Sequence, residues 1–115
     1  MQKSAMVADY LQQCARWRLD RAGTADDRRD ARSALALLDA AAVARALVDS
    51  DRVILRLHAA GCFVLGRYSP GVEGERLVRF WHYEAPDGDP EDLLALLVDC
   101  AERARNPVPA QRAPS

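Results

Sequence analysis

The segment from residue 52 to residue 85 constrains the fold of this chain most, because it lies between two stretches of helix-forming sequence and differs from both in composition. It holds both histidines, both phenylalanines, one of the two tryptophans and two of the three tyrosines. Glycines separate its strand-prone runs, a pattern typical of short β-strands joined by turns. We therefore expect a small β-sheet in the middle of an otherwise helical chain.

The sequence on either side of this segment predicts helices. Residues 4–22 repeat apolar side chains at steps of three and four, and Gly23 suits the end of such a helix. A second helix is expected to start at Thr24, to run to about residue 48 and to form an antiparallel hairpin with the first. Asp39 is a second N-cap at which it could divide into two. Pro90 and its acidic neighbours begin a C-terminal helix, which a Pro-rich tail at residues 106–115 follows.

The leading interpretation of the central segment is a three-stranded antiparallel meander. Its expected strands are Arg52–His58, Cys62–Tyr68 and Leu77–Ala85. A turn at residues 59–61 would pair Leu57 with Phe63 and Leu55 with Leu65, which places these four side chains on one face beneath the helices. The sequence thus predicts a single α+β domain over residues 1–105: a helical hairpin, a meander and a C-terminal helix.

The other face of this meander motivates a binding function. It would carry arginines, aromatic rings and apolar groups that no helix covers, which is typical of an interaction surface. The candidate binding residues are Ile54, Arg56, His58, Tyr68, Arg79, Trp81 and Tyr83. We expect a small non-enzymatic protein that binds itself, as a homodimer, or binds another protein.

The same segment also allows a helical alternative. Asp51 can cap a helix from Arg52 to Ala60 that ends at Gly61, with helices at 26–38 and 40–48 before it and a hairpin after it. The stretch VARALVDSDRVILRLHAAGCFVLGRY in this order resembles a winged helix-turn-helix, through Leu47, Val53, Leu57 and Gly61.

This resemblance implies a DNA-binding regulator. Arg52 and Arg56 would then contact bases or phosphates from the second helix of the motif, and Arg67 and Arg76 would contact DNA from the wing. The consecutive aliphatic residues in RVILRL favour a strand over an amphipathic helix, so the meander remains the leading interpretation.

Composition limits the remaining functions. The net charge of −1 supplies no general positive field for nucleic acid, and no run approaches the ~20 apolar residues that a membrane span needs. The three cysteines lie far apart and lack metal-ligand spacing, so we expect a reducing, cytoplasmic setting without metal or cofactor. A third interpretation, a small enzyme or ligand-binding domain, needs a pocket around His58 or His82, the two side chains that titrate near neutral pH.

Overall fold

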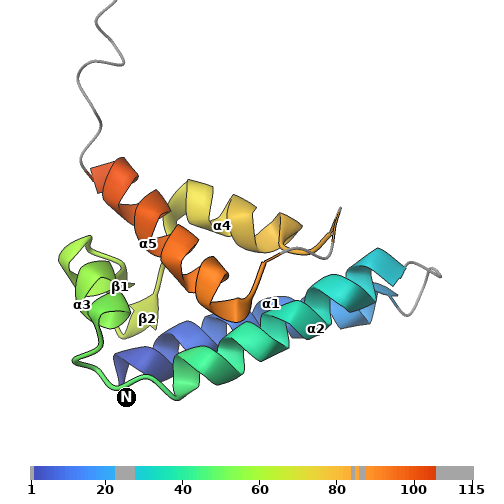
Figure 1. Ribbon diagram of the computed structural model, residues 1–115, viewed down its shortest axis with the longest axis horizontal. Coiled ribbons are helices and arrows are strands. Elements are labelled where there is room, and N and C mark those ends of the chain that lie inside the picture. The colour runs from blue at the N-terminus through green and yellow to red at the C-terminus, as the bar shows by residue number, and fades with distance from the viewer. Residues whose placement is uncertain (1, 23–27, 84, 86–87, 106–115) are drawn as a thin grey trace, which may run out of the picture.

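The computed structural model describes residues 2–22, 28–83, 85 and 88–105, and this part of the chain is mostly helical (Figure 1). The described elements, in chain order, are α1 (Lys3–Ala22), α2 (Arg28–Arg45), α3 (Arg52–Ala59), β1 (Phe63–Val64), β2 (Arg67–Tyr68), α4 (Gly71–Phe80) and α5 (Pro90–Arg105). The expected α+β domain with a three-stranded meander is therefore wrong, because the only described sheet is a pair of two-residue strands.

Helices α1 and α2 form the antiparallel hairpin expected from the sequence. Arg45, at the end of α2, binds Asp9 near the start of α1 at 3.0 Å, and Arg18 pairs with Asp30 at the opposite end at 3.7 Å. Small side chains of α2 allow the two helices to approach closely. Asp39 does not divide α2, which is a single helix. The expected caps at residues 23 and 24 lie outside the described residues, as does the tail at 106–115.

Helices α4 and α5 lie across this hairpin, with α3 and the two strands at one end (Figure 1). Helix α5 begins at Pro90, and the carboxylate of Asp92 accepts a hydrogen bond from the Asp89 backbone N–H at 2.9 Å. It packs on α2, α3 and α4, rather than on a sheet. Side chains from all five helices and from β2 share one buried core. None of these helices has both the length and the apolar character to cross a lipid bilayer.

Residues 52–59 form helix α3 instead of the expected first strand, because both of its ends are capped. The side chain of Asp51 accepts a hydrogen bond from the Val53 N–H at 2.9 Å. At the other end, Gly61 has a φ of 81°, its N–H donates to the His58 carbonyl, and the Cys62 N–H donates to the Leu57 carbonyl. These two bonds make a Schellman motif, which ends the helix.

Residues 62–69 fold back on themselves as a hairpin, so the expected second strand is also wrong. Phe63 pairs with Tyr68 and Val64 with Arg67, leaving Leu65 and Gly66 as the turn. The expected pairs Leu57–Phe63 and Leu55–Leu65 cannot form, because residues 55 and 57 are helical.

The expected third strand is replaced by the end of α4 and a turn. Gly74, Leu77, Val78 and Trp81 recur at helical spacing and face the core or lie partly buried against it. A β-carbon on Gly74 would lie 2.6 Å from the Cβ of Pro70, so only glycine permits this close approach.

The winged-helix alternative is correct for its last helix and hairpin but wrong for the helices before them. A helix does occupy residues 52–59 and a hairpin does follow. However, the expected helices 26–38 and 40–48 are one helix, α2, and α3 packs mainly on α5. The paired helices of the motif are therefore absent from the described residues.

Candidate functional site

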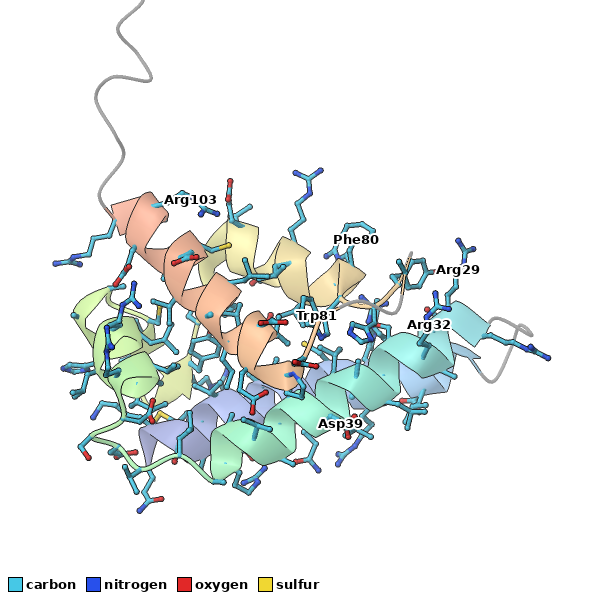
Figure 2. All side chains as sticks on the ribbon, in the orientation of Figure 1. Arg29, Arg32, Asp39, Phe80, Trp81 and Arg103 are labelled. Atoms are coloured by element: carbon cyan, nitrogen blue, oxygen red, sulfur yellow. The ribbon has the colours of Figure 1, made fainter. Side chains whose placement is uncertain are left out.

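The seven candidate binding residues do not share one surface. Ile54 is fully buried in the core, and Tyr68 and Trp81 are also buried, which leaves these three unavailable as an open contact face. In Figure 2, Trp81 lies inward among the helices while its neighbour Phe80 projects from the end of α4. Arg79 is exposed on α4. Arg56 and His58 lie on the exposed side of α3.

The guanidinium of Arg56 is occupied by an acidic partner within the chain. Its Nε lies 2.9 Å from Oε2 of Glu102 and its Nη2 lies 2.6 Å from Oε1, a two-pronged contact between α3 and α5. The hydrogen bond from Arg56 lowers the pKa of Glu102, and the same bond raises the pKa of Arg56. His58 stacks on Phe63, with ring centroids 6.4 Å apart.

The turn that follows α4 is tied to the first turns of α2. The Oγ of Ser33 donates to the Trp81 carbonyl at 2.7 Å, and Arg32 donates to the carbonyls of His82 and Tyr83 at 2.9 and 2.8 Å. In Figure 2, Arg32 lies on α2 and Trp81 follows α4, on the two sides of this junction. These bonds give the segment a structural role, because they satisfy its backbone carbonyls.

The ring of Tyr83 lies beside two guanidinium groups. The Cζ of Arg29 is 5.0 Å from its centroid and the Cζ of Arg18 is 5.5 Å from it. This arrangement joins α1, α2 and the turn after α4. We therefore assign Tyr83 to the packing of the helices, together with Trp81.

The tip of the β-hairpin is the least expected part of the surface. Leu65 is 95% exposed and has a φ of 54°, a left-handed conformation that residues with a β-carbon rarely adopt. Its neighbour Val64 is about half exposed. We call these two residues the hairpin tip. The sequence pattern predicted that Leu65 lies inside a strand, although a glycine at position 66 is the usual mark of such a turn.

A hollow of about 250 Å³ lies between α1 and α4, and we call it the α1–α4 hollow. Its lining residues are Tyr10, Gln13, Cys14, Trp17, Arg18, Glu75, Val78 and Arg79. Trp17 is 56% exposed here, although it continues the apolar spacing of α1. Small-molecule sites usually measure about 300–1,000 Å³, so this hollow suits one or two side chains of a partner better than a ligand.

The hairpin and the α1–α4 hollow adjoin each other. A second hollow is lined by Met6, Asp9, Tyr10, Gln13, Gly66, Arg67 and Tyr68. It shares Tyr10 and Gln13 with the first and reaches Gly66, the residue next to Leu65. Burial raises the pKa of both the Tyr10 hydroxyl and the Cys14 thiol, so both groups are uncharged at neutral pH.

Neither histidine lines any of four surface hollows, which include the two above, one on α3 and α5 and one on α4. Within the described ranges, no group of three or more histidine, cysteine or acidic residues is placed to hold a metal ion. Comparisons with protein-family models, curated proteins and solved structures find no match to this chain. Function has to be inferred from the geometry of the hairpin tip and the α1–α4 hollow.

Proposed function

We propose that this chain is a non-enzymatic protein that acts by binding protein surfaces, that it binds a second copy of itself, and that the hairpin tip is the principal contact. The observation that carries the proposal is the state of Leu65, which is both strained and exposed. A left-handed leucine costs roughly 1–2 kcal/mol, and a leucine in water recovers none of this through burial. Strained residues are enriched at binding and active sites, which favours a role in binding.

The chemistry around the hairpin tip supports a protein partner. Val64 and Leu65 are neighbours and both are exposed, and the exposed cation of Arg67 lies on the returning strand, where it pairs with Val64. An apolar centre beside a charged rim is the usual composition of a protein contact. Burying Leu65 in a partner contributes roughly 1.5–3 kcal/mol, which makes it the expected hot spot of the interface.

Sedimentation velocity over a wide protein concentration range tests this proposal, with Leu65→Ala as the variant. We expect the wild type to associate with rising concentration, and the variant to associate about tenfold or more weakly, the equivalent of about 1.4 kcal/mol. Leu35→Ala is the matched control, because Leu35 is also exposed but lies on the regular helix α2. A wild type that stays monomeric at the highest concentration, or a Leu65→Ala variant that associates equally well, contradicts the proposal.

Duplex DNA is a second candidate partner, favoured by one observation: residues 52–59 are helical and a hairpin follows them. Arg52 and Arg67 are exposed on these elements. Against this candidate, Glu102 occupies Arg56, and the apolar hairpin tip offers phosphates nothing to bind. Fluorescence anisotropy with a labelled duplex decides it: binding that falls with salt and with Arg52→Ala would favour DNA over protein.

A further inference from the structure

We propose that the α1–α4 hollow receives the hairpin tip of a second copy of this chain, in a closed two-fold dimer in which each copy supplies one tip and one hollow. This inference rests on the proposed function and adds to it the site in which Leu65 is buried. The chain displays an apolar projection without a cover, and beside it a recess whose lining combines aromatic and aliphatic side chains with Arg18, Glu75 and Arg79. Each would remove the other from water.

The size and lining of the α1–α4 hollow fit the hairpin tip. An apolar cavity of roughly 150 Å³ holds a benzene molecule, so about 250 Å³ has room for the side chains of Leu65 and Val64. Tyr10, Trp17 and Val78 line it with aromatic and aliphatic surface. The Cys14 thiol is protonated at neutral pH and adds no charge to this lining.

One pair of opposite charges also matches between the two surfaces, in a hollow that Arg18, already paired with Asp30, and Arg79 line as well. Arg67 is exposed two residues beyond Leu65, and Glu75 is exposed at the edge of the α1–α4 hollow. Neither side chain has an ion pair or hydrogen bond to another described residue. When Leu65 enters the hollow of the other copy, Arg67 approaches Glu75, and the two opposite charges favour this orientation.

The position of the two surfaces favours a closed dimer over an open chain. Gly66 and Arg67 line the hollow that shares Tyr10 and Gln13 with the α1–α4 hollow, so tip and recess lie side by side. With a two-fold axis through this second hollow, each copy can place its hairpin tip in the α1–α4 hollow of the other copy at the same time. Association should therefore stop at two copies.

Alkylation of Cys14 reports directly on filling of the α1–α4 hollow. Cys14 is partly exposed there, whereas Cys62 and Cys100 are buried in the fold and serve as internal references. We expect the rate of Cys14 alkylation, followed by mass spectrometry of peptides, to fall as the wild-type concentration rises. The rate in Leu65→Ala should not change with concentration. Unchanged alkylation of Cys14 in an associating wild type would overturn the assignment of this hollow.

A charge exchange supplies the second test. Arg67→Glu and Glu75→Arg each place like charges together in both contacts of the dimer, so each variant alone should associate several-fold more weakly than the wild type. An equal mixture of the two restores opposite charges at both contacts, so it should form a heterodimer about as well as the wild type forms its dimer. Arg76→Glu is the matched control, because it makes the same charge change at an exposed position of α4 outside this hollow.

The outcomes separate this inference from the proposed function. A wild type that never associates overturns both. Association that Leu65→Ala weakens but Glu75→Arg does not, or a mixture that fails to recover, overturns the hollow as the receiving site and leaves the hairpin tip as a contact for another surface. Masses that grow beyond two copies overturn the closed dimer.

Discussion

Replacing Leu65 with asparagine should stabilise the chain while removing its binding contact. Leu65 and Gly66 are the two central residues of the hairpin turn, and their φ angles are 54° and 74°. Positive φ at both positions defines a type I′ turn, for which Asn-Gly is a preferred pair. The present Leu-Gly pair satisfies only the second position, because leucine has a branched side chain and no local hydrogen bond to offer.

The size of the gain follows from the exposure of Leu65. Since its side chain is 95% exposed, asparagine gives up almost no buried apolar surface. The left-handed conformation costs leucine roughly 1–2 kcal/mol, and asparagine avoids much of this cost. We expect the free energy of unfolding to rise by about 1 kcal/mol, which for a domain of this size raises the Tm by about 4–8 °C.

Thermal unfolding followed by circular dichroism measures this gain at a dilution where the protein is monomeric. Leu65→Ala is the matched control, because alanine removes the apolar side chain but keeps a β-carbon in the left-handed region, so its Tm should stay near that of the wild type. Both variants should lose association, and only Leu65→Asn should gain stability. Equal Tm values for the two variants would refute the idea that strain is stored at this turn.

Three further outcomes test other parts of the fold. Ile54→Ala should lower the free energy of unfolding by about 2–5 kcal/mol in urea titrations, because Ile54 is fully buried, whereas Leu55→Ala on the exposed side of α3 should cost far less. Tyr68→Phe should leave the free energy of unfolding unchanged or raise it by about 1 kcal/mol, because the buried Tyr68 hydroxyl has no hydrogen-bond partner among the described residues. A large loss in the same titration would show that the hydroxyl is hydrogen-bonded. Arg56 lowers the pKa of Glu102, so their contact should stabilise the fold above the usual glutamate pKa and lose this effect as the pH falls through the lowered value. The difference in the free energy of unfolding between wild type and Glu102→Gln should therefore shrink below about pH 4, and a difference independent of pH would contradict this.

The helical ends of this chain were predictable and its centre was not. Apolar side chains of α1 recur at helical steps that no strand can use, so periodicity alone identifies the helix. The run from Val53 to Leu55 fits a strand by its composition, yet a helix needs only Ile54 and Leu57 on its buried side. Asp51 and Gly61, at the two ends of this run, favour the helix through their capping hydrogen bonds. A pattern of hydrophobic residues does not reveal such bonds.

The candidate site was less accessible from the sequence, because exposure depends on which elements pack together. Trp17 continues the apolar spacing of α1, a pattern that predicts a covered side chain, but α4 lies across α1 without closing over it. Trp81 and Ile54 were expected on an open sheet face, and both instead face the helical core. In the sequence, only the glycine after Leu65 indicates the turn that exposes the hairpin tip.

Two residues of α2, Asp30 and Ser33, help to fix the shape of the α1–α4 hollow, although neither would contact a side chain bound in it. Arg18 lines the hollow and is paired with Asp30, while Arg79 lines it two residues before the carbonyl that Ser33 holds. Both walls are thus fixed to the start of the same helix. Changes at Asp30 or Ser33 should alter the width of the hollow and hence its selectivity for what it receives, although neither side chain lines it.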